Sequence, residues 1–160
     1  MRLKNKLIII VIILFVVMGL VYFYPQKINK EYHGILYRIG NESDEEQTDI
    51  TLNGYITRGL IQGDRFEGSI IIGEKELAKL DMRFFNYGAP LLYYDEASGD
   101  YRSYGYIYMD NSRDKLSISI FEPKGQGKGM QSWSSKDGLI ISAPANNLNE
   151  AIEITNELVK

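Results

Sequence analysis

Residues 50–72, ITLNGYITRGLIQGDRFEGSIII, decide the fold, because apolar and polar side chains alternate in two runs joined by a glycine-containing connection. Ile50 and Leu52 carry the alternation in the first run, and Ile70 and Ile72 carry it in the second. A period of two residues indicates β-strands with one buried face. A parallel crossover needs a dozen or more residues, so this short connection predicts antiparallel neighbours.

The same alternation continues on both sides of this stretch. Gly34, Gly68 and Gly105 lie inside apolar runs, and glycine within a strand marks a bulge or a sharp bend of the sheet. Residues 73–80, GEKELAKL, have a helix-forming composition, so 74–80 is either a strand or a short helix. Further strands are predicted at residues 35–39, 80–84, 91–94, 101–109, 116–120 and 139–142, with a tight turn at 97–100.

The carboxyl end has a helical period instead. Asn147 is placed as an N-cap, and Glu150 three positions later supplies a carboxylate that can reach back to it. The apolar side of the predicted helix, residues 148–159, is one arc formed by Leu148, Ala151, Ile152, Thr155, Leu158 and Val159.

Residues 7–24, LIIIVIILFVVMGLVYFY, contain no charged side chain across 18 positions. As a helix they would be roughly 27 Å long, close to the hydrocarbon thickness of a bilayer. The aromatic residues before Pro25 fit the membrane interface. A cleaved signal peptide would need a small-residue cleavage site, which is not found after Gly19, and a buried core helix would leave apolar surface exposed. We therefore predict an uncleaved transmembrane anchor.

The fold class that follows is α+β, mainly β. An N-terminal transmembrane helix precedes a bent antiparallel meander or partly closed barrel, and a C-terminal helix covers one face or mouth. Basic side chains precede the anchor more densely than they follow it, which favours a cytoplasmic amino terminus. The predicted division is a cytoplasmic segment at 1–6, a transmembrane helix at 7–24, a tether at 25–30 and an extracytoplasmic domain at 31–160.

Charge and cysteine content exclude several classes of function. Residues 31–160 hold 13 basic and 21 acidic side chains, a net charge of −8. Nucleic-acid binding needs a basic surface, so we expect no nucleic-acid partner. The chain has no cysteine and one histidine, which excludes disulfides, thiolate chemistry and a zinc site of the usual kind. We expect no cofactor and no bound metal.

A resemblance to a known group of proteins rests on four parts of the chain: the predicted anchor, residues 50–72, residues 91–109 (LLYYDEASGDYRSYGYIYM) and residues 133–158 (WSSKDGLIISAPANNLNEAIEITNEL). The chain resembles small, single-pass membrane-anchored proteins of Gram-positive bacteria with no assigned function. The resemblance covers nearly the full length and rests on the overall pattern. It implies a bacterial membrane location and implies no catalytic residues.

The aromatic residues of the strand at 101–109 are the candidate ligand-binding set. Arg102, Tyr104, Tyr106 and Tyr108 are expected on one face of this strand, and Ile107 and Met109 lie on the other. With Trp133, the tyrosines could stack on sugars or on a peptide. The alternative is structural, since tyrosine is a favoured strand residue that pairs across strands.

Other motifs are weaker. His33 is expected to be solvated, and Ser112 with Lys115 matches S-x-x-K in a predicted hairpin, where the chemistry of that motif does not fit. The run Glu42, Asp44, Glu45, Glu46 and Asp49 is predicted to be a solvated loop rather than a calcium site, and residues 124–130, KGQGKGM, to be a flexible connection.

We therefore predict a binding, sensing or accessory module at the cell envelope, with no catalytic residue assigned. Its expected partners are the lipid bilayer through residues 7–24 and an envelope glycan, peptide or membrane protein. The alternative is a small envelope hydrolase that uses a carboxylate pair, for which Asp95, Glu96 and Asp100 are the nearest candidates.

Overall fold

The structure is a computed structural model and describes residues 3–123 and 131–159. Within these residues it contains two helices and ten strands: α1 (Leu3–Tyr22), β1 (Gln26–Arg38), β2 (Asn41–Thr57), β3 (Arg65–Ile72), β4 (Lys75–Arg83), β5 (Gly88–Asp95), β6 (Asp100–Met109), β7 (Leu116–Ile120), β8 (Glu122–Pro123), β9 (Gln131–Ser132), β10 (Leu139–Ala143) and α2 (Leu148–Leu158).

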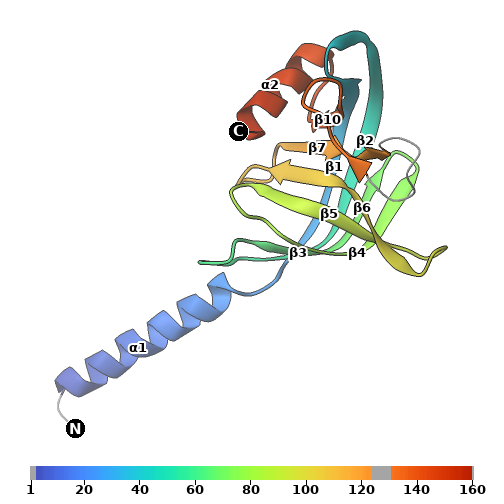
Figure 1. Cartoon of the computed structure of the whole chain (residues 1–160). Coiled ribbons are helices and arrows are strands. Elements are labelled where there is room, and N and C mark those ends of the chain that lie inside the picture. Colours follow the sequence, from blue (N-terminus) through green and yellow to red (C-terminus); the bar gives the residue numbers. More distant parts are fainter. Residues whose placement is uncertain (1–2, 124–130, 160) are drawn as a thin grey trace.

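Eight of the strands form one antiparallel sheet in the order β4-β3-β2-β1-β10-β7-β6-β5. The order follows the chain around the sheet, and the two edge strands, β4 and β5, lie against each other. The sheet therefore rolls into a nearly closed barrel (Figure 1). The pair β8 and β9 is a separate two-stranded hairpin between β7 and β10. The prediction of a partly closed antiparallel barrel is confirmed.

The barrel interior is filled by side chains. Ile50, Leu52, Ile70 and Ile118 of the inner face have at most 1% of their surface exposed, and Phe66 is equally buried in the same cluster. Burying each such side chain contributes about 1.5–3 kcal/mol. The alternation read from residues 50–72 thus selects the inner face, and the interior is a packed core rather than a ligand cavity.

Close approach of neighbouring strands requires the glycines. A Cβ on Gly105 would overlap the carbonyl oxygen of Ser119 on β7, and one on Gly68 would overlap that of Asn53 on β2. The register of the β3–β4 pair also shifts next to Gly68. These glycines are architectural, as the sequence indicated.

Helix α2 packs on the outer face of the barrel against β1, β7 and β10. Its buried residues are Ala151, Ile154 and Leu158. Asn147 is the N-cap, since its side-chain oxygen accepts a hydrogen bond from the Glu150 amide at 3.1 Å, and the Glu150 carboxylate reaches back to the Asn147 side chain at 2.9 Å. The predicted helix, its cap and its position over one face are confirmed.

Two segments differ from the expected pattern. The helix-or-strand segment 74–80 is strand, because Gly73 takes a positive φ of 57° and turns the chain back from β3 into β4. Pairing along β3 therefore overrides the local helix propensity. The expected acidic loop is instead the first half of β2, which pairs with β1 as far as Asn41.

Helix α1 projects away from the barrel on the side opposite to α2 (Figure 1). The expected helix is present over Leu3–Tyr22, but β1 begins at Gln26, so most of the predicted tether at 25–30 is strand. In the part of the chain that the structure describes, no helix meets the length and apolarity required of a membrane span.

Candidate functional site

A groove lies between α2 and the barrel wall, and we call it the α2 groove. Its volume is about 690 Å³. One side of the groove comes from α2, and the other comes from the end of β1, the turn after it and the segment after β9. The lining residues are Tyr37, Arg38, Ile39, Gly40, Asn41, Trp133, Ser135, Ile140, Leu148, Ile152, Thr155, Asn156 and Val159.

Helix α2 presents an apolar stripe to this groove. Leu148 and Ile152 lie four residues apart, so they share one side of the helix, and Val159, the extended C-cap residue, continues the apolar lining beyond the end of α2. The barrel covers a different set, centred on Ala151 and Ile154, and Ile152 is exposed. The apolar arc of α2 is therefore wider than the surface it buries, and the surplus lines the groove.

Trp133 forms the opposite wall. Its indole Nε1 donates to the carbonyl oxygen of Leu139 at 3.2 Å, and Gly138 packs so closely under the ring that a Cβ there would overlap it. The half-buried side chain packs against the core beneath α2. One edge of the indole is fixed by the protein, and the ring contributes to the groove lining.

Hydroxyl groups bridge α2 and the barrel at the base of the groove. The Thr155 hydroxyl lies 2.7 Å from the Tyr37 hydroxyl and 2.7 Å from the Ser142 hydroxyl, and it donates to the carbonyl oxygen of Ala151 in its own helix at 3.0 Å. The Ser117 hydroxyl lies 3.0 Å from that of Ser142. Burial raises the pKa of Tyr37 above its ordinary value, so the cluster is neutral at physiological pH.

Arg38 supplies the cation of the groove, but acidic groups already pair with it. Its two terminal nitrogens donate to the two Glu122 carboxylate oxygens at 2.9 Å each, and Asp44 lies 3.6 Å from Nε. The hydrogen bond from Arg38 holds the pKa of Glu122 below its usual range. With its charge balanced in this way, the groove suits a neutral ligand better than an anion.

The structure separates the predicted ligand set. A register shift between Leu91 and Leu92 produces a bulge in β6, and Tyr104 packs against the barrel core, with its ring centre 6.4 Å from that of Tyr93. Tyr106 and Tyr108 remain neighbours, with their ring centres 5.0 Å apart, and Tyr108 packs against the core under α2. Strict alternation along 102–108 was therefore wrong at Tyr104.

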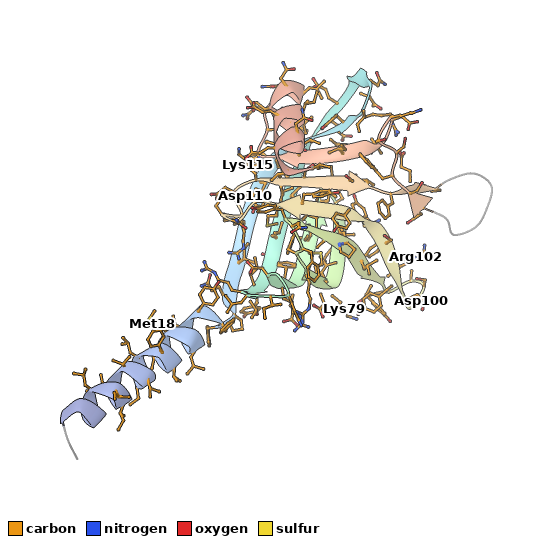
Figure 2. The ribbon with its side chains drawn as sticks, turned by 60° about the vertical axis from the view of Figure 1, so that its left-hand side comes forward. Met18, Lys79, Asp100, Arg102, Asp110 and Lys115 are labelled. Carbon is orange, nitrogen blue, oxygen red and sulfur yellow. The ribbon has the colours of Figure 1, made fainter. Side chains whose placement is uncertain are left out.

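The remaining two members lie elsewhere. Arg102 is at the end of the barrel away from α1, near Asp100 (Figure 2). Its Nε lies 2.7 Å from an Asp95 carboxylate oxygen. Trp133 lines the α2 groove instead. The signal for this groove was present in the sequence as the wide apolar arc of the C-terminal helix.

Asp95 is not arranged as a general acid. Its carboxylate accepts hydrogen bonds from the Ser98 hydroxyl at 2.9 Å and from the Ala97 amide at 3.2 Å. These bonds, together with Arg102, lower the pKa of Asp95, whereas a catalytic acid needs a raised pKa. Glu96 lies 4.0 Å from the Lys79 ammonium on the exposed surface. The geometry does not support the carboxylate-pair hydrolase.

The other motifs also have structural partners. His33 is exposed, as expected, but its Nδ1 lies 2.6 Å from Asp49 across the β1–β2 pair, a neighbour that the sequence analysis missed. The Ser112 hydroxyl donates to Asp110, and Lys115 donates to Glu157 of α2 at 2.5 Å. The Glu157 bond raises the pKa of Lys115, which is the wrong direction for a proton acceptor.

Among the described residues, no group of three or more histidine or acidic side chains is placed to hold a metal ion. The KGQGKGM segment at 124–130 lies outside the described residues. Comparison of the chain with protein-family models, with curated proteins and with solved structures finds no match. The resemblance to membrane-anchored proteins of Gram-positive bacteria thus stays a prediction.

Proposed function

We propose that this protein is a membrane-anchored binding module of the cell envelope that acts as a sensor or accessory subunit. Residues 7–24 would embed in the bilayer, with the amino terminus in the cytoplasm and the barrel outside. This is supported by α1, on which nearly every side chain described, from Leu7 to Tyr22, is exposed and apolar. Free in water such a surface would aggregate, whereas in lipid it is solvated.

The ligand site of this module is the α2 groove, and the ligand class is an extended peptide segment with apolar side chains. The observation that carries this proposal is the stripe of Leu148, Ile152 and Val159 opposite Trp133. A neutral apolar groove with one fixed aromatic wall accommodates aliphatic side chains. Amide groups such as that of Asn156 at the rim can pair with a peptide backbone.

The location is tested by membrane fractionation of the full chain. We expect the protein to stay in the pellet after alkaline carbonate extraction and to require detergent for release. A reporter that is active only in the cytoplasm, fused after Lys160, is expected to be silent. Full-length protein that dissolves without detergent would contradict the anchor, and an active reporter would reverse the orientation.

The ligand class is tested with the single tryptophan of the chain as the reporter. We expect blocked tri-leucine peptide to change the Trp133 emission of the detergent-solubilised full chain, and blocked tri-serine to leave it unchanged. Ile152→Asn is expected to abolish the response, and the matched substitution Leu92→Asn, an exposed leucine on the barrel wall, is expected to preserve it. A response to N-acetylglucosamine hexamer but not to tri-leucine would favour a glycan instead.

A further inference from the structure

The loop between β2 and β3, residues 58–64, displays two large aliphatic side chains at its tip. Leu60 has 72% and Ile61 has 94% of its surface exposed. Single exposed aliphatic residues are common, but two in succession on a protruding loop form a wedge. We call Leu60 and Ile61 the loop wedge.

The loop that carries the wedge is held in place by several contacts. The Gly59 amide donates to the Asp64 carboxylate at 3.2 Å, and Arg113 pairs with the same carboxylate at 2.7 Å. Arg83 donates to the side-chain oxygen of Gln62 at 2.7 Å. The backbone of Gly59 also packs directly on that of Gly63, where a Cβ would overlap the carbonyl oxygen. A loop fixed in this way keeps its two aliphatic side chains in the solvent-facing position.

The loop wedge lies beside the end of α1. The Arg58 guanidinium is 5.4 Å from the centre of the Tyr22 ring, and Figure 1 shows the β2–β3 connection projecting next to the point where α1 meets the barrel. Tyr24, at the same junction, is 72% exposed. The exposed apolar surface of α1 is therefore continued by the loop on the barrel itself.

We propose that the loop wedge inserts into the outer surface of the same bilayer that holds α1. This inference rests on the proposed membrane anchor and adds a second lipid contact, made by the barrel. Leu60 and Ile61 would enter the boundary between headgroups and acyl chains, as the apolar faces of interfacial segments do. Arg58 and Tyr22 lie at the level of the headgroups, where arginine pairs with lipid phosphate and tyrosine is enriched.

The absence of cysteine from the sequence makes a direct test available. Ile61→Cys is labelled with an environment-sensitive fluorophore, and the full chain is reconstituted into phosphatidylcholine–phosphatidylglycerol vesicles with nitroxide-labelled acyl chains. We expect the label at position 61 to emit at a shorter wavelength than the same dye conjugated to a small thiol in detergent-free buffer. We also expect the nitroxide to quench it. Ala97→Cys, in the β5–β6 turn at the other end of the barrel, is the matched control and is expected to remain unquenched.

A third label separates this inference from the anchor on which it rests. Met18→Cys places the fluorophore in α1 (Figure 2). Quenching at positions 18 and 61 but not at 97 supports both proposals. Quenching at 18 alone overturns the loop insertion and leaves the anchor standing. No quenching at 18 overturns the anchor, and the loop inference fails with it. Adding Leu60→Ser to the position-61 variant is expected to reduce its quenching.

Discussion

Tyr32 shows how one inward-facing residue makes stability depend on pH. Its hydroxyl donates to the carbonyl oxygen of Arg113 at 2.7 Å, and its side chain is buried in the barrel core. Burial, with a smaller contribution from Asp110 and Asp114, raises the pKa of Tyr32 from 10.0 to about 12. The folded state therefore favours the neutral phenol more than the unfolded chain does.

This shift predicts a loss of stability in alkali. A raised pKa in the folded state contributes stability that is fully present below pH 10 and is lost as the pH rises toward about 12. A shift of this size corresponds to roughly 2–3 kcal/mol. Urea unfolding of the full chain in mild detergent at pH 9 and pH 11.5 measures it. Tyr32→Phe should lose less stability between the two pH values than the parent, whereas Tyr101→Phe, at an exposed tyrosine, should behave like the parent.

Gly105 sets a steric limit at the contact between β6 and β7. Gly105→Ala is expected to lower the free energy of unfolding by about 3 kcal/mol or more, because the new methyl group would meet the backbone of Ser119, which cannot move without breaking the ladder. In Gly88→Ala the new methyl group would instead meet the Tyr106 ring, which can rotate away. The midpoint of urea unfolding compares the two variants. Equal losses would show that the strands at Gly105 can separate.

At the scale of elements, alternation located the strands well because each has one face on the core. It failed at two kinds of place. Gly105 indicated a bulge or bend in β6, but the residue that the bulge turns inward, Tyr104, is set by the pairing with β5. The segments at 26–34 and 41–49 are polar or acidic, but the long hairpin of β1 and β2 pairs them along their length. Backbone pairing across strands fixes such segments whatever their side chains prefer.

The cap of α2 gives a prediction at this scale. Asn147→Ala is expected to destabilise the protein by about 1 kcal/mol, because the Glu150 amide loses its acceptor at the first turn. Thermal unfolding followed by circular dichroism measures the change. Asn156→Ala, on the groove side of the same helix, is the control and should have a smaller effect. A larger loss of stability in Asn156→Ala than in Asn147→Ala would show that contacts at the groove rim stabilise α2 more than its N-cap does.

At the scale of the whole molecule, the hydrogen-bonded pairing around the barrel is interrupted between β4 and β5, which we call the seam. These strands are the two edges of the sheet, so each is hydrogen-bonded along one side only, whereas β7 is paired on both sides by β6 and β10. We expect hydrogen exchange to be fast at amides of β5 that face the seam and slowest in β7. Uniform protection around the barrel, measured by mass spectrometry on the full chain, would contradict an open seam.

The sequence indicated single components of the α2 groove but not how they come together. The sequence prediction grouped Trp133 with the tyrosines of residues 104–108, but Trp133 lines the α2 groove with Tyr37, because the groove joins distant segments that no local pattern brings together. The wide apolar arc of the C-terminal helix was visible, and a helix with more apolar surface than one sheet face covers indicates a second contact. The floor of the groove comes from β1 and β10, whose paired residues, such as Ile35 and Ser142, are distant in the chain and become neighbours only in the folded sheet.

The three residues between α1 and β1 determine where the barrel can work. Fully extended, three residues span only about 10 Å. The barrel therefore stays close to the end of α1. With the proposed anchor in a bilayer, a ligand bound by the barrel would be held close to the point where α1 leaves the membrane. If α1 is anchored as proposed, only targets that reach this distance from the bilayer would meet the α2 groove, and a tilt of α1 would move the barrel with it.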